Sequence, residues 1–288
     1  MSQWVLPEYY DAYYSFVDGK PSEDVDSNPK ETIYCLVFIS TIGFTHGVKK
    51  PELRWLKQYK ESESLKESRD IAQKLLDEIK SGQFPDLYVW VLATSYAGID
   101  RNGMAFLQGM EKEIESLSLS PDKVTFGTKS LTLSQAKALV WYNFSLCVMA
   151  PRLVDKVNRY GLKKGIFVVD RLGGNDKTVM DFMELVSNQS SMHKLWLRAS
   201  EGHTTKPEGI GFFYINRKGD DGKVTGPNAT MQFCLTDWMT QAAYSFKNPG
   251  GTRDSGFESD LVQLVHYLGK NNYLEIIELK GDIDWFSS

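Results

Sequence analysis

The sequence predicts a mixed α/β protein, with a mixed sheet flanked by helices in a single main domain. Three observations predict this class. Strand patterns come early in the chain, helix and strand patterns alternate after them, and the apolar strands show little polar alternation, as in a sheet covered on both faces. A break rich in Pro and Gly at residues 248–255 divides the chain into a main domain, residues 1–247, and a C-terminal helical appendage, residues 248–288, packed on it.

Two strand patterns open the chain. Residues 13–17 are rich in aromatic and β-branched side chains, and Asp18-Gly19 directly after them predicts a turn that ends the strand. Residues 32–41 are the most strand-like segment of the sequence, and we expect residues 42–48 to continue it or to pair with it. Residues 51–79 then repeat leucine and isoleucine at helical intervals, which predicts one or two helices.

Helices and strands alternate through the rest of the chain. Apolar periodicity predicts helices over residues 104–117, 134–160, 177–186, 231–246 and 258–268. Short apolar runs predict strands over residues 87–94, 165–169, 193–198 and 211–216, and Asp221-Gly222 favours a hairpin turn within residues 218–222. The most apolar long run, residues 138–154, contains polar interruptions and falls short of the ~18 apolar residues of a membrane span. We therefore expect a buried helix there.

Composition excludes several classes of protein. With 42% hydrophobic residues and a net charge of −4, the chain is neither a disordered segment nor a general polycationic binder. Cys35, Cys147 and Cys234 lie far apart and form no C-x-x-C pair, so we expect free buried thiols in a reducing compartment. Residues 1–6 show no signal-peptide pattern. The prediction is a soluble cytoplasmic protein.

Common catalytic signatures are absent from the sequence. It contains no phosphate-binding G-x-x-x-x-G-K-[ST], no nucleophile elbow G-x-S-x-G and no zinc-binding H-E-x-x-H. The four histidines have no ligand spacing, and Gly173-Gly174 does not belong to a G-x-G-x-x-G dinucleotide fingerprint. The remaining candidates are carboxylates that follow strands.

Three aspartates form the candidate catalytic and metal-binding set. Asp18 and Asp170 each follow a strand pattern, and Asp237 lies inside an apolar helix pattern. If the two strands are sheet neighbours, their backbones lie ~4.8 Å apart, and the two carboxylates repel each other unless a cation lies between them. Three convergent carboxylates suit Mg²⁺ or Mn²⁺, and two such ions can clamp a phosphodiester. The alternative is that each aspartate only forms a turn or caps a helix.

The order of these motifs resembles the family called domain of unknown function 3800. The resemblance covers roughly residues 13–246 and rests on Asp18-Gly19, on Val168-Val169-Asp170-Arg171, and on residues 233–239, which resemble a Leu-Gln-x-Ala-Asp helix. It implies an RNase H-like fold. Gly19-Lys20 stands where the family has Glu-Ser, and Cys234 and Thr236 stand where Gln and Ala are usual. These differences put activity in doubt more than fold.

Basic segments give a possible path for a nucleic-acid strand. The predicted contacts are Lys50, Arg54, Trp55, Lys57 and Arg171. Their phosphate-binding cations and stacking ring are typical of single-strand binding surfaces. A second basic set, Arg152, Lys156, Arg159, Lys163 and Lys164, precedes the Asp170 strand. The alternative is a solvated helix face balanced by nearby glutamates.

Two functional hypotheses follow. The first is a Mg²⁺- or Mn²⁺-dependent nuclease or phosphodiesterase of RNase H-like type. The second is a catalytically degenerate RNase H-like module that binds protein or nucleic acid without cutting it. A protein partner or a homo-oligomer is compatible with either hypothesis, and neither includes a membrane.

Overall fold

The structure is a computed structural model of the 288-residue chain. It describes residues 12–20, 28–42, 77, 80–81, 87–170, 177–189, 192, 194, 209–215, 227–250 and 255–283. Of these, residues 20, 41–42, 170, 209–215, 227–235, 237 and 255–261 are described by their backbone alone.

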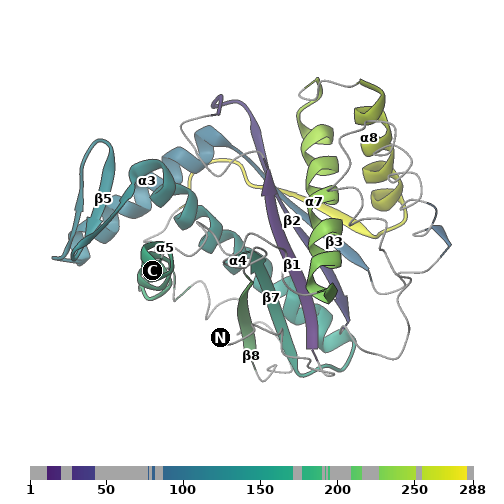
Figure 1. Cartoon of the computed structure of the whole chain (residues 1–288), viewed down its shortest axis with the longest axis horizontal. Coiled ribbons are helices and arrows are strands. Elements are labelled where there is room, and N and C mark those ends of the chain that lie inside the picture. Colours follow the sequence, from purple (N-terminus) through teal and green to yellow (C-terminus); the bar gives the residue numbers. More distant parts are fainter. Residues whose placement is uncertain are drawn as a thin grey trace.

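A six-stranded mixed sheet forms the centre of the molecule, in the order β8-β7-β1-β2-β3-β9 (Figure 1). Three neighbouring strands are antiparallel: β1 (Ala12–Lys20), β2 (Ile33–Ile42) and β3 (Tyr88–Ser95). The other three join them in parallel: β7 (Lys164–Asp170) beside β1, β8 (Gly209–Ile215) beside β7, and β9 (Leu274–Glu278) beside β3. The predicted mixed sheet is confirmed.

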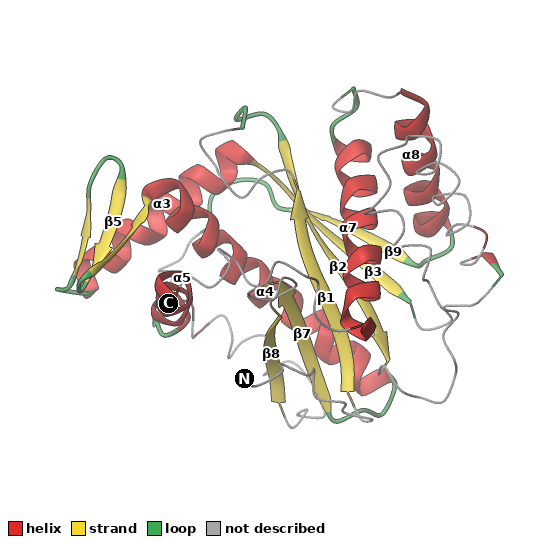
Figure 2. Ribbon diagram, in the orientation of Figure 1, coloured by secondary structure: helices red, strands yellow, loops and turns green. Residues whose placement is uncertain are grey.

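Helices cover both faces of this sheet (Figure 2). One face packs against α3 (Tyr96–Glu113) and α4 (Leu133–Arg159), and the other against α7 (Pro227–Lys247) and α8 (Ser255–Lys270). Helix α5 (Lys177–Ser187) packs against α4 and the strand β6 (Lys129–Thr132). Each face of the sheet has its own hydrophobic core, and the residues of β1 alternate between the two. Tyr13 and Val17 pack on the α4 side, while Tyr14 and Phe16 pack on the α7 side. This double burial explains why the strands lack polar alternation.

The long apolar run of the sequence is the buried helix α4. A capping box begins it, in which Thr132 Oγ1 accepts from the Gln135 backbone N–H and Gln135 Oε1 accepts from the Thr132 backbone N–H. None of the helices in the described part of the chain combines the length and hydropathy that crossing a bilayer requires.

The α3–α4 contact depends on Gly103. A β-carbon at this position would lie 2.9 Å from Lys137 Cβ, 3.0 Å from Lys137 Cα and 3.1 Å from the Lys137 carbonyl oxygen. Two of these atoms belong to the α4 backbone, so a side chain at position 103 would push the two helices apart.

We expect Gly103→Ala to lower the free energy of unfolding by about 1–2 kcal/mol, because overpacking outweighs the better helix propensity of alanine. Chemical denaturation measures this loss. The matched control is Gly269→Ala in α8, where a β-carbon meets nothing within 4 Å. Equal denaturation midpoints for the two variants would contradict the close approach.

The sequence-based boundaries need two corrections. Asp18-Gly19 does not end the first strand, because β1 runs on to Lys20 and pairs with β2 through both residues. Helix α3 begins at Tyr96, earlier than predicted, and ends before Leu117, which belongs to a strand. A three-stranded sheet was not predicted: β4 (Leu117–Leu119), β5 (Lys123–Phe126) and β6 (Lys129–Thr132). Its strands are too short to leave a readable alternation in the sequence.

Several predicted segments lie outside the described residues: 43–48, 51–79 apart from position 77, 193–198 apart from the helical position 194, and 218–222. The C-terminal segment supplies β9 to the main sheet, and α8 packs against α7. The division at residue 247 stays a prediction.

Candidate functional site

The pairing of β1 with β7 brings Asp18 and Asp170 to neighbouring backbone positions. The two strands are parallel, and their last paired residues are Val17 and Val169. Asp18 and Asp170 come directly after this pair, so their backbone positions are neighbours across the two strands. The sequence left open whether the two strands are neighbours, and the structure places them side by side.

Asp18 is half-buried within β1. One carboxylate oxygen, Oδ1, accepts a hydrogen bond of 3.0 Å from the backbone N–H of Gly19. Across the strand pair, Asp18 lies opposite Val37 of β2. The Asp18 carboxylate therefore has a hydrogen-bond donor on its own strand.

Gly19 has a steric reason to be glycine. A β-carbon there would lie 2.0 Å from Tyr34 Oη and 3.1 Å from Leu36 Cδ1, both on the neighbouring strand. A larger side chain at position 19 does not fit beside Tyr34 in the present arrangement.

Asp237 lies in α7, which packs across β1 and β2 (Figure 1). The end of α7 is fixed to the start of β2, because the Asn248 side chain accepts from the Ile33 N–H at 2.8 Å and donates to the Ile33 carbonyl at 2.9 Å. Position 237 is ~16 Å back along the helix from Asn248, by the helical rise of 1.5 Å per residue. Val37, the partner of Asp18, is ~13 Å along β2 from Ile33. Positions 237 and 37 are therefore at similar distances, along their own elements, from the contact between Asn248 and Ile33.

The described residues contain no group of three or more His, Cys, Asp or Glu side chains that could hold a metal ion. The side chains of Asp170 and Asp237 lie outside the described set, so this finding does not bear on the three predicted ligands together. The structure brings the backbone positions of Asp18 and Asp170 together and puts Asp237 on the helix that covers them.

The predicted nucleic-acid contacts at positions 50, 54, 55, 57 and 171 lie outside the described residues. The second basic segment is described and has intramolecular partners. Arg152 pairs with Glu275 at 2.9 Å, and the ammonium of Lys156 lies 3.6 Å from the centroid of the Tyr88 ring. Burial, followed by the charge of Arg159, lowers the pKa of Lys156. Arg152, Lys156 and Arg159 belong to α4, which lies on the opposite face of the sheet from α7.

The two described cysteines are not poised for nucleophilic chemistry. Burial raises the pKa of the Cys35 thiol to about 12, although the charge of Lys247 opposes the shift. Burial also raises the pKa of Cys147. Both thiols therefore stay protonated at neutral pH, which favours the predicted structural role.

Three consecutive residues at the start of α3 form contacts that the sequence reasoning missed. Asp100 accepts from Lys30 and Lys137, Arg101 pairs with Asp282, and the Asn102 side chain bonds to the backbone of residues 281 and 283. The only sequence signal was a lysine at position 137 inside an otherwise apolar helix pattern, because a buried lysine needs a carboxylate partner.

The fold and these positions define the protein as a mixed α/β protein that carries two aspartates at adjacent strand positions beneath a helix. In comparisons with known proteins, no family model matches the chain and no curated protein matches it.

Proposed function

We propose that this protein is a Mg²⁺- or Mn²⁺-dependent phosphodiesterase that cuts nucleic acid, with an RNase H-like fold. The observation that carries the proposal is the parallel pairing of β1 with β7, which puts the backbones of Asp18 and Asp170 at neighbouring positions. Two strand-borne carboxylates so close repel each other in a partly buried place unless a cation is present.

The strand order supports the RNase H-like part of the proposal. Three antiparallel strands, β1 to β3, are followed by β7 and β8, which join in parallel on the other side of β1. This is the arrangement expected of an RNase H-like sheet, and the resemblance to domain of unknown function 3800 implied the same fold.

The residues present fit a hard divalent cation. Asp18 and Asp170 supply carboxylate oxygens from neighbouring strands, and Asp237 lies on the covering helix. A bound Mg²⁺ would activate a water molecule and stabilise the charge that develops on the phosphodiester. In this proposal the chain's own contribution is to hold the carboxylates on rigid elements, since strands and a packed helix position ligands more firmly than loops.

Two observations favour the second candidate, a module that binds without cutting. The Asp18 carboxylate accepts from Gly19, and Tyr34 occupies the space that a glutamate at position 19 would need. The first gives Asp18 a structural role in β1, and the second keeps a further carboxylate out of position 19.

A thermal-shift experiment tests the metal site on which the phosphodiesterase, but not the binding module, depends. We expect Mn²⁺ at 100 times its dissociation constant to stabilise the wild-type protein by roughly 2.7 kcal/mol, and Asp170→Asn to abolish this shift. The matched control is Asp155→Asn, the same change at an exposed position of α4, which should leave the shift intact. A shift that persists in Asp170→Asn means that the metal binds elsewhere.

Cleavage is measured on labelled single- and double-stranded DNA and RNA with Mn²⁺. The proposal expects fragments from wild type and Asp155→Asn and none from Asp170→Asn. If wild type and both variants leave the substrates intact but still bind nucleic acid, the protein is the module that binds without cutting.

A further inference from the structure

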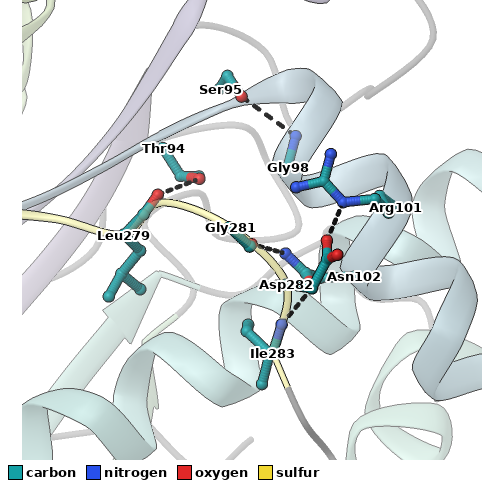
Figure 3. Close-up of polar contacts among 9 residues, drawn as sticks. All are labelled: Thr94, Ser95, Gly98, Arg101, Asn102, Leu279, Gly281, Asp282 and Ile283. Carbon is teal, nitrogen blue, oxygen red and sulfur yellow. Dashed lines mark hydrogen bonds and ion pairs between the residues drawn. The ribbon is translucent and has the colours of Figure 1, made fainter.

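The side chain of Asn102 bonds to the main chain of a segment that follows β9 (Figure 3). Asn102 lies in α3 and is only 4% exposed. Its Nδ2 donates to the carbonyl of Gly281 at 3.1 Å, and its Oδ1 accepts from the N–H of Ile283 at 2.8 Å. These groups belong to residues two apart, so the amide forms the pair of bonds that a neighbouring β-strand would make.

Neighbouring residues extend the same kind of contact (Figure 3). Thr94 Oγ1 donates to the carbonyl of Leu279 at 3.1 Å, and the N–H of Leu279 donates to the carbonyl of Ala93 at 3.0 Å. All four hydrogen bonds go to the main chain of residues 279–283. We call the surface made by Ala93, Thr94, Arg101 and Asn102 the cradle, and residues 279–283 the strap.

Side-chain recognition by the cradle is limited to three positions of the strap. Leu279 and Ile283 pack against the core beneath, and Asp282 pairs with Arg101. Gly281 has φ of 88°, a conformation that favours glycine. The cradle therefore selects a segment of the form apolar, any residue, glycine, acidic, apolar, with a bend at the glycine.

The strap is held at the surface. The side chain of Asp282 is 77% exposed and that of Arg101 is 53% exposed, so their ion pair is screened by water. After Leu279, which bonds to Ala93 of β3, the side-chain amide of Asn102 takes the place of a strand partner. Apart from the exposed Asp282–Arg101 pair, the polar contacts between the cradle and the strap go to the main chain of the strap, which suits a segment that another segment of like sequence can replace.

We propose that the cradle is a binding site for a short peptide of a protein partner, and that the strap occupies it as an intramolecular competitor. The partner segment carries glycine followed by an acidic residue between two apolar residues. Because the strap is covalently attached, its effective concentration is on the order of millimolar, and it blocks weak peptides until it is displaced. This inference is independent of the proposed phosphodiesterase.

The test uses the full chain and a fluorescein-labelled peptide of residues 277–283, Ile-Glu-Leu-Lys-Gly-Asp-Ile. Gly281→Val releases the strap without changing the cradle, because valine does not readily adopt a φ of 88°. Asp282→Arg is a second releasing variant, since it places a cation against Arg101. Faster hydrogen exchange of residues 279–283, with cooperative melting retained, verifies release.

We expect both releasing variants to bind the peptide at least tenfold more tightly than wild type, as measured by fluorescence anisotropy. Adding Asn102→Ala to Gly281→Val should abolish the gain, whereas Gln108→Ala, at an exposed position of the same helix, should not. A peptide with lysine in place of its aspartate should bind less tightly.

Three results would overturn the proposal. The first is that both variants release the strap and yet bind the peptide no better than wild type. The second is that Asn102→Ala and Gln108→Ala have the same effect. The third is that neither variant accelerates exchange in residues 279–283, because the strap is then a fixed part of the fold.

Discussion

Phe38→Ala is expected to lower the free energy of unfolding by about 3–5 kcal/mol, the largest effect we predict for a single substitution. Phe38 is fully buried at the centre of β2, and its ring meets the ring of Phe167 edge-on, with centroids 6.0 Å apart. Removing the ring takes apolar surface out of the core and leaves a cavity that the rigid sheet cannot close.

Guanidinium denaturation measures this loss. Phe38→Leu is the graded control. Leucine keeps much of the buried volume, so this substitution should lower the free energy of unfolding by less than Phe38→Ala does. Tyr160→Ala is the surface control, since Tyr160 is 38% exposed. The free energy of unfolding of a native protein is only about 5–15 kcal/mol. Phe38→Ala should therefore also reduce the yield of folded protein. A loss near that of Tyr160→Ala would mean that Phe38 is not in the core.

Asp100→Ala has the second-largest expected effect, a loss of about 2–3 kcal/mol. Lys137 is 5% exposed, and its ammonium lies 2.5 Å from Asp100. Removing the carboxylate leaves a buried cation without its counter-charge, which typically costs about 3–5 kcal/mol for a fully buried pair. We expect less here, because the side chain of Asp100 is 36% exposed and water screens it.

The double variant Asp100→Ala/Lys137→Met checks this cause. We expect it to recover most of the stability, because the buried charge is gone along with its partner. Asp155→Asn serves as a control, because Asp155 is exposed and lies in α4, the helix that contains Lys137. If the double variant is as unstable as Asp100→Ala, the buried charge is not the reason for the loss.

The ion pairs of Asp100 should also make the free energy of unfolding depend on pH. Burial by itself would raise the pKa of Asp100, but the hydrogen bonds and charges of Lys137 and Lys30 outweigh it, and the pKa is lowered from 3.8. A carboxyl group whose pKa is lower in the folded state contributes stability above its unfolded pKa and loses it as the pH falls through the folded value. The stability difference between wild type and Asp100→Asn should therefore be full at pH 7 and shrink below pH 4. A difference that stays constant to pH 3 would contradict this linkage.

Much of the architecture could be predicted because its signals are local. The apolar run of β2 and the helical periodicity of α4 follow from side chains within a few residues of one another, and both elements lie where expected. The end of β1 could not be predicted in this way. Asp18-Gly19 is a common turn sequence, yet in this chain β2 pairs with both residues and keeps them in the strand.

The candidate site was only partly predictable. The identities of Asp18, Asp170 and Asp237 could be singled out from the strands and helix that precede or contain them. Their relation in space depends on which strands pair, and that choice is made by contacts between distant parts of the chain. The Asn102 cradle left no pattern in the sequence, because an asparagine in an amphipathic helix does not indicate which backbone it bonds to.

The sequence by itself determined the class of the protein, the strands that are covered on both faces and the acidic residues that follow or interrupt apolar segments. Only the tertiary structure decided that β1 and β7 are parallel neighbours, that Tyr34 lies against Gly19, and that Asp100 neutralises Lys137. The physical reason is range: backbone propensity and hydrophobic period act over a few residues, whereas strand pairing, close packing and buried charge pairs join residues that only the folded chain brings together.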